Sequence, residues 1–126
     1  MNKAVLMGRL TKDPELKTTQ NGNSVCSFTL AIDRRFKNQQ GERETDFIPI
    51  VAWRQTAEFV AKYFSKGSKI ALVGSIQTRS WEDEQGQRRY ATEVVTDEVY
   101  FADSKRQADN QSEYMPASDE RLPFDL

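Results

Sequence analysis

The sequence has no histidine, and Cys26 is its single cysteine. Without histidine the chain lacks the usual general acid or base, the base of a Ser/His or Cys/His nucleophile pair, and the imidazole ligands of most zinc sites. One cysteine cannot form a disulfide within the chain. These absences exclude most mechanisms of small enzymes. We therefore expect a protein that is not an enzyme and that carries no metal or other cofactor.

Long apolar runs are also missing. No run approaches the roughly 18 residues that a membrane-spanning helix needs, and the mean hydropathy is -0.73. The opening sequence, MNKAVLMGRL, alternates and is too short for a signal peptide. A chain of 126 residues fits one small domain with, at most, a tail. We expect a cytoplasmic protein without a membrane partner.

An excess of positive charge is absent too, since the formal net charge is -1. Residues 104–126 contain three basic and five acidic side chains, whereas residues 1–103 contain fifteen basic and fourteen acidic ones. A near-neutral domain can still present a basic groove if its charges are segregated by sign. The net charge therefore does not exclude a nucleic-acid partner.

Apolar and polar residues alternate in five segments, which is typical of β-strands. The predicted strands are residues 2–10, 26–33, 46–53, 69–81 and 88–101. Residues 34–45 are polar and charged around Gly41, and we expect a long loop there. The turn sequences Asn21-Gly22-Asn23 and Glu84-Gln85-Gly86 precede the second and the fifth strand.

One segment has a helical period. Between residues 56 and 66 apolar side chains recur every three or four positions, which predicts a helix capped by Thr56 and ended by Gly67. In the strand that follows, Ile70, Leu72 and Ile76 share the expected core face, and Gly74 indicates a bulge or a bend. The helical side chains expected to close one end of the core are Phe59, Val60, Tyr63 and Phe64.

Five strands with one helix between the third and the fourth form the element order of the OB-fold. This fold is a small five-stranded barrel that binds oligonucleotides or oligosaccharides on one face. We expect an all-β OB-fold domain over residues 1–103. The apolar pattern ends after it, and the composition of residues 104–126 predicts a disordered tail.

Several aromatic side chains fall outside the expected core. Phe47 and Trp53 are an even number of positions apart, on the face of their strand opposite Ile50. Trp81 shares a face with Arg79 on the fourth strand. Aromatic rings beside arginines are typical of proteins that bind single-stranded nucleic acid, because stacking contributes roughly 1 to 3 kcal/mol per base without reading sequence.

The residues Arg34, Arg35, Phe36 and Lys37 repeat this combination in the expected loop. Each aromatic alone fits ordinary packing or an oligomer contact, but together with the arginines they favour a binding surface. For Val51 and Phe101 packing is the preferred interpretation. Cys26 is expected to be a buried, inert thiol. We interpret the acids at positions 82–84 as solvated charge at a hairpin tip rather than a metal site.

Four segments stand in a fixed order: NKAVLMGRL, TQNGNSVCSFTLAIDRRF, GERETDFIPIVAWRQTAEFVAKYFSKGS and VGSIQTRSWEDEQGQRRYATEVV. In this order they closely resemble the bacterial single-stranded DNA-binding protein family, across residues 1–103. The resemblance implies a cytoplasmic, nucleoid-associated homotetramer of OB-folds. Single-stranded DNA wraps around such a tetramer and is protected during DNA replication, repair and recombination.

The resemblance also assigns residues. By position, the base-stacking aromatics of the family fall on Phe36, Phe47, Trp53 and Trp81. Its basic DNA contacts fall on Lys3, Lys66 and Arg79. Further phosphate partners expected from the residues themselves are Arg9, Arg34, Arg35, Lys37, Arg54 and Arg88.

The family ends in a disordered linker and an acidic tip, finishing in Pro-Phe, that docks onto DNA-maintenance enzymes. The corresponding partner-binding residues here are Asp119, Glu120, Leu122, Pro123, Phe124, Asp125 and Leu126. This tip differs from the family pattern because Arg121 interrupts the acids, the linker is short, and two residues follow Phe124. The resemblance implies docking of replication, repair and recombination proteins here, with the effect of the last two residues on affinity left open.

Two other functions are compatible with a small barrel. A metal-dependent nuclease would need acids clustered on the binding face, whereas the acids of this chain fall at turns or in the tail. Cleavage of labelled single strands with Mg²⁺ or Ca²⁺ would reveal such an enzyme. An RNA-binding module of the cold-shock type would prefer RNA over DNA in direct competition.

Overall fold

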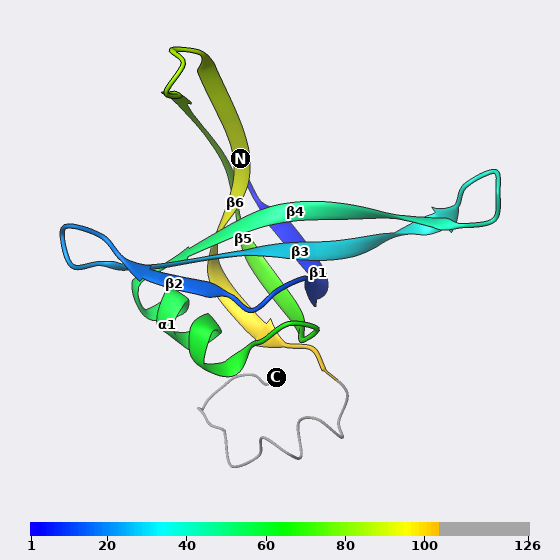
Figure 1. The fold of residues 1–126 in the computed structure, drawn as a ribbon. Helices are drawn as coiled ribbons and strands as arrows, with labels where there is room; N and C mark the ends of the chain where they lie inside the picture. Colours follow the sequence, from blue (N-terminus) through cyan, green and yellow to red (C-terminus); the bar gives the residue numbers. More distant parts are fainter. Residues whose placement is uncertain (104–126) are drawn as a thin grey trace.

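The computed structural model describes residues 1–103, so the predicted tail and its partner-binding tip lie outside the described residues. None of the helices in residues 1–103 is long and apolar enough to cross a membrane. The elements in chain order, shown in Figure 1, are β1 (Ala4–Leu10), β2 (Glu15–Thr18), β3 (Ser24–Lys37), β4 (Arg43–Trp53), α1 (Arg54–Tyr63), β5 (Lys69–Glu82) and β6 (Arg88–Phe101).

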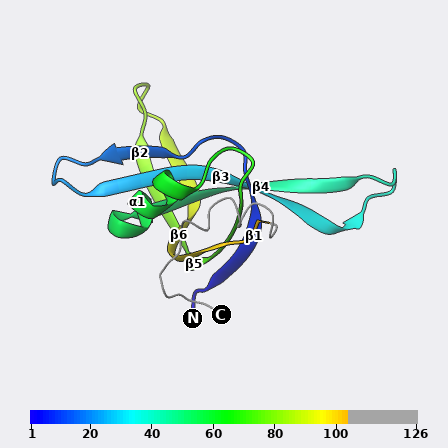
Figure 2. The same cartoon turned by 90° about the horizontal axis from the view of Figure 1, so that it is seen from below.

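Five of these strands close into a barrel. The strands neighbour one another in the order β1, β5, β6, β4, β3, and β1 also pairs with β3, which joins the two edges. The β4–β6 pairing is parallel and the others are antiparallel. Helix α1 follows the third barrel strand and lies against one end of the barrel (Figures 1 and 2). The predicted OB-fold architecture is confirmed.

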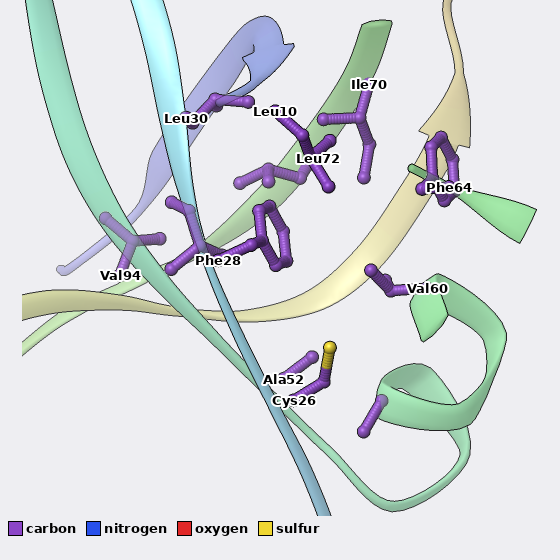
Figure 3. Close-up of a cluster of buried hydrophobic side chains, with 12 residues drawn as sticks. Leu10, Cys26, Phe28, Leu30, Ala52, Val60, Phe64, Ile70, Leu72 and Val94 are labelled. Atoms are coloured by element: carbon purple, nitrogen blue, oxygen red, sulfur yellow. The ribbon is translucent and has the colours of Figure 1, made fainter. Parts of the chain in front are cut away.

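A single core fills the barrel (Figure 3). Every barrel strand and α1 contribute to it, because inward positions alternate with outward ones along each strand. Burial raises the pKa of the Cys26 thiol to about 11, so this side chain stays protonated inside the core, as predicted. The buried apolar residues are Leu10, Cys26, Phe28, Leu30, Ile50, Ala52, Ala57, Val60, Phe64, Ile70, Leu72 and Val94.

Strand β2 was not predicted from the sequence. All four of its residues are exposed, and it pairs with the first part of β3, from Glu15 beside Ser27 to Thr18 beside Ser24. The predicted turn between them is present: the Gly22 N–H donates to the Thr19 carbonyl oxygen at 2.9 Å. Gly22 has a φ of 85°, which glycine adopts without steric cost. The turn therefore closes a hairpin beside the barrel.

The prediction of a long loop over residues 34–45 is wrong. Strand β3 continues to Lys37 and β4 already begins at Arg43, so most of this segment is a β-hairpin arm (Figure 1). The Arg43 guanidinium donates to the carbonyl oxygens of Arg34 and Arg35, at 3.0 and 2.6 Å. Both faces of the arm meet solvent, so its strands need no apolar alternation and the sequence signal is missing.

The helix boundaries also differ from the prediction. Helix α1 begins directly after Trp53, which occupies the N-cap position without a side-chain hydrogen bond, so Thr56 is not the cap. The helix ends at Tyr63, and Gly67, with a φ of 87°, serves the turn that follows instead of ending the helix. Thr56 instead lies in the first turn of the helix.

Aromatic rings pack together at the helical end of the barrel. Phe101 stacks on Phe64 with ring centroids 5.0 Å apart and also contacts Phe59 at 5.6 Å. Packing against α1 is therefore confirmed for Phe101. Tyr63, predicted to be core, is 41% exposed because it lies at the outer edge of this cluster, 6.0 Å from Phe101.

The irregularity expected at Gly74 is confirmed by the pairing of β5 with β6. The register shifts between Val73 and Gly74, where Asp97 is the extra residue on β6. A Cβ on Gly74 would lie 2.3 Å from the Val95 carbonyl oxygen, so only glycine fits this approach. Beyond it the β5–β6 hairpin leaves the barrel as a second arm (Figure 1), and Ile76, expected on the core face, is 49% exposed.

Candidate nucleic-acid interface

Strand pairing joins three of the predicted aromatics into one outer face. Phe47 and Trp53 point outward from β4 and are 63% and 42% exposed. Val51, half-buried between them, pairs with Val95 of β6. Paired residues of β5 and β6 share a side of the sheet, so Val95 and Trp81 face the same way. Trp81 is 40% exposed. We call this surface, spanning β4, β6 and β5, the aromatic face.

A shallow hollow of about 350 Å³ lies on this face. Outward residues of β3 and β4 line it, together with Glu93 of β6 and the segment after β1. That segment contributes Lys12, Asp13 and Glu15. The Asp13 carboxylate accepts the backbone N–H of Lys66 at 2.8 Å, which attaches the segment to the turn after α1. Lys12 was not among the predicted contacts, and only its place in the fold reveals it.

Trp81 has a cation over its ring. The guanidinium carbon of Arg79 lies 4.7 Å from the centroid of the indole. The Nε and Nη2 atoms of Arg79 donate to the two carboxylate oxygens of Glu93, both at 3.2 Å. Arg79 is therefore next to Trp81 as predicted, but its charge is paired.

The structure places Phe36 apart from the other three aromatics, on the β3–β4 arm. Phe36 is 77% exposed, and the guanidinium carbon of Arg35 lies 5.3 Å from its ring centroid. The register of β3 with β4 shifts between Asp33 and Lys37, so alternation cannot carry the orientation of the aromatic face out to the arm. Both Arg35 and Lys37 are exposed there.

Arg34, a predicted phosphate partner, already has two acidic partners. Its Nε and Nη2 atoms donate to the Asp46 carboxylate, both at 3.0 Å, and Nη1 lies 3.0 Å from Glu44. The hydrogen bond with Asp46 is the main cause that raises the pKa of Arg34, and it lowers the pKa of Asp46. Arg34 therefore holds the arm together rather than offering a free charge.

Three predicted cations lie around β1. Lys3 precedes its first residue and is exposed, and the exposed Lys66 lies in the turn beside its other end. Arg9 donates to the Gly67 carbonyl oxygen at 2.9 Å and lies 3.7 Å from the Asp103 carboxylate. The Arg9 side chain thus already has partners in the turn after α1 and beyond β6, whereas the two lysines are exposed to solvent.

Of the remaining predicted cations, Arg54 adjoins the aromatic face, whereas the register places Arg88 on the side of its arm opposite Trp81. Arg54 follows Trp53 directly, is exposed, and has a positive φ of 57° at the junction of β4 with α1. Arg88 lies on the β5–β6 arm, 3.9 Å from the Glu82 carboxylate. Tyr90 is 77% exposed but lies on the side of this arm opposite Trp81, outside the aromatic face. Its alternation with Val94 resembled that of a core position.

Among the acids at the tip of this arm, Asp83 stabilises the turn. The Asp83 carboxylate accepts the N–H groups of Gln87 and Gln85 at 2.9 Å each and the Nε of Arg89 at 2.9 Å. The hydrogen bond from Gln87 is the main cause that lowers the pKa of Asp83. Within residues 1–103 no group of three or more His, Cys, Asp or Glu side chains could hold a metal ion.

Comparison with known proteins gives consistent matches. Residues 1–102 match the family model described as the single-strand binding protein family. The chain is 53% identical over 113 residues to single-stranded DNA-binding protein 1 of Staphylococcus aureus (strain MSSA476), covering 90% of this chain and 72% of that protein. It is 49% identical over 128 residues to single-stranded DNA-binding protein 2 of Clostridium acetobutylicum, covering 99% and 96%. The single-stranded DNA-binding protein of Streptococcus mutans is 50% identical over 112 residues, covering 89% and 68%.

Proposed function

This chain belongs to the single-strand binding protein family, whose members bind DNA without enzymatic activity, and from that premise we propose how it binds single-stranded DNA. Bases stack on the aromatic face and on Phe36, while lysines and arginines around them neutralise phosphates. Such binding tolerates any sequence and protects single strands in replication, repair and recombination. We place this function in the cytoplasm, at the nucleoid.

The aromatic face is the observation that carries this proposal. Phe47, Trp53 and Trp81 expose large apolar rings on the same side of the sheet, as the strand pairing shows. None of them belongs to the buried core. Every base has a π-face, so exposed rings can stack on unpaired bases of any kind at roughly 1 to 3 kcal/mol each. Bases in a duplex are already stacked and paired, which makes a single strand the better ligand.

Charge pairing separates the proposed phosphate contacts into two groups. Lys3, Lys12 and Lys66 are exposed and lie around the hollow and β1, and Arg35, Lys37 and Arg54 flank the aromatic rings. In contrast, Arg9, Arg34, Arg79 and Arg88 each lie within 4 Å of an acid. Exposed ion pairs are weak, so phosphate can compete for Arg88 more readily than for the doubly bonded Arg34.

A fluorescence titration with oligo(dT) tests the proposal. We expect the emission of Trp53 and Trp81 to be quenched on binding, because stacked bases contact both indoles. The logarithm of the affinity should fall with the logarithm of the salt concentration, by about 0.7 for each phosphate neutralised on a single strand. Mixed-sequence DNA should bind almost as tightly as oligo(dT). Equally tight binding of duplex DNA, or preference for RNA in competition, would contradict the proposal.

We also propose that the protein is a homotetramer. Val5 and Met7 point outward from β1 and are 73% and 53% exposed, while Ala4 and Leu6 on the other side pack on the core. Val73 and Ala71 of β5 lie directly beside them in the pairing register. An apolar surface of this kind on a small barrel is typical of a subunit interface. The resemblance to the family implies four subunits.

Residues 119–126, outside the described part of the chain, are proposed to recruit DNA replication, repair and recombination proteins. Deleting them should abolish partner binding while preserving or slightly tightening binding of oligo(dT), since the acids compete with DNA for the same cations. Pull-down of a helicase or recombination protein measures the loss, and Phe124→Ala separates the apolar contact from the charged one. Retention of partners by the deletion variant would leave the segment without a docking role.

A further inference from the structure

Glu93, Arg79 and Trp81 form a chain of contacts on the aromatic face. Glu93 pairs across the strands with Gln77, and Arg79 pairs with Ala91, so the ion pair between Glu93 and Arg79 runs diagonally. Ala91 is small and leaves the long Arg79 side chain room to reach along β6. The Glu93 side chain is only 16% exposed, whereas that of Arg79 is 58% exposed. The carboxylate is thus the partly buried, anchored end of the chain.

The geometry leaves Arg79 few free directions. Two of its N–H groups are used by the two Glu93 oxygens, and its guanidinium carbon lies over the indole, 4.7 Å from the centroid. A fork of two hydrogen bonds fixes the plane of a guanidinium, which a single ion pair does not. One side of the Trp81 ring is therefore covered by a cation whose position Glu93 determines.

The other ion pairs of this arm differ in kind. Arg88 and Glu82 approach only to 3.9 Å, with both side chains more than half exposed. Arg89 donates to Asp83, which serves the turn. Among the described arm residues, the pair on Trp81 is thus the one that joins a charge to a proposed base platform.

We propose that Glu93 is a positioning residue of the single-strand site. It holds Arg79 against Trp81 and cancels its charge, so this part of the face takes a base by stacking and takes no phosphate. The inference rests on the proposed function and deepens it. It also replaces the prediction that Arg79 is a phosphate contact, because a neutralised cation releases no counterion when DNA binds.

Salt dependence of oligo(dT) binding distinguishes the two roles of Arg79. Glu93→Gln keeps the shape of the side chain but frees the charge of Arg79, so the slope should steepen by about 0.7 per bound site, an additional loss of about 2.6-fold over a fourfold rise in salt. The double variant Arg79→Gln/Glu93→Gln removes both charges and should keep the wild-type slope. Glu82→Gln is the matched control, since it removes an equal charge from the side of the same arm opposite Trp81. It should change the slope less than Glu93→Gln, because phosphate can already compete for the weakly paired Arg88 in the wild type.

A second measurement needs no DNA. In a Trp53→Phe background Trp81 is the only tryptophan, and acrylamide quenching of its emission reports how well the ring is covered. Glu93→Ala should increase this quenching, Glu93→Gln should increase it less, and Glu82→Gln should leave it unchanged. Thermal unfolding of each variant verifies that the barrel is intact.

The outcomes separate this inference from the proposed function. An unchanged salt slope in Glu93→Gln, or a slope shallower by about 0.7 in the double variant, would show that Arg79 binds phosphate despite Glu93. Unchanged acrylamide quenching in Glu93→Ala would likewise overturn the positioning role. Failure of the wild-type protein to bind oligo(dT) would instead reject the proposed function, while the quenching experiment would still test how Glu93 holds Arg79.

Discussion

Replacing Trp81 or Trp53 by alanine is expected to weaken binding of oligo(dT) by roughly 1 to 3 kcal/mol each, which corresponds to roughly 5-fold to 150-fold in Kd. The thermal midpoint should stay almost unchanged. Both indoles lie outside the core and are 40% and 42% exposed, so their removal deletes a stacking surface and opens no cavity. Trp53 precedes α1 but makes no side-chain capping hydrogen bond, so the helix loses no cap.

Tyr90→Ala provides the matched control for Trp81→Ala. Tyr90 is an aromatic residue on the same arm, 77% exposed, and points to the side opposite Trp81. Its replacement should leave the affinity close to that of the wild type. Anisotropy of a labelled oligo(dT) measures binding, and thermal unfolding measures stability. Intact binding combined with a large loss of stability in the tryptophan variants would mark both indoles as packing residues.

The exchange Val5→Lys is expected to convert the proposed tetramer into smaller species. Val5 exposes 73% of its surface on the outer side of β1, where a neighbouring subunit would cover it. An unpaired charge buried at such an interface costs about 3 to 5 kcal/mol, and the closed symmetry of a tetramer repeats that cost in every subunit. Light scattering at micromolar concentration should report four 14.5 kDa chains for the wild type and fewer for the variant.

Leu16→Lys is the control for this exchange. Leu16 is 47% exposed on β2, beside the barrel, so the same change of chemistry there should leave the mass unaltered. A monomeric wild type, or a Val5→Lys variant with an undiminished mass, would show that the outer side of β1 is not a subunit interface.

Much of the barrel could be predicted because core positions impose a period. In β4, Ile50 and Ala52 are buried while Phe47 and Trp53 are exposed, so a simple alternation reports both the strand and its two faces. The helix was found in the same way, from the three- and four-residue spacing around Val60. Phe47, Trp53 and Trp81 followed from the same periods, since they occupy outward positions of their strands.

The elements that the sequence did not predict are those that do not pack on the core. Strand β2 and the β3–β4 arm are solvated on both sides, so polar residues serve them as well as apolar ones and no period marks them. Ile76 was misplaced for a related reason. Its alternation with Leu72 is genuine, but the shift in register at Gly74 takes the strand away from the core before that position.

The sequence by itself determined the inward and outward faces of the barrel strands, apart from misplaced positions such as Ile76, because the two kinds of position alternate along each strand. Only the tertiary structure decided which cations are free. Arg34 and Asp46 are twelve positions apart, and Arg79 and Glu93 are fourteen apart. Each pair meets because antiparallel strands bring distant residues within hydrogen-bonding reach. Whether an arginine can neutralise a phosphate thus depends on its neighbour across the sheet, which the linear order of residues does not reveal.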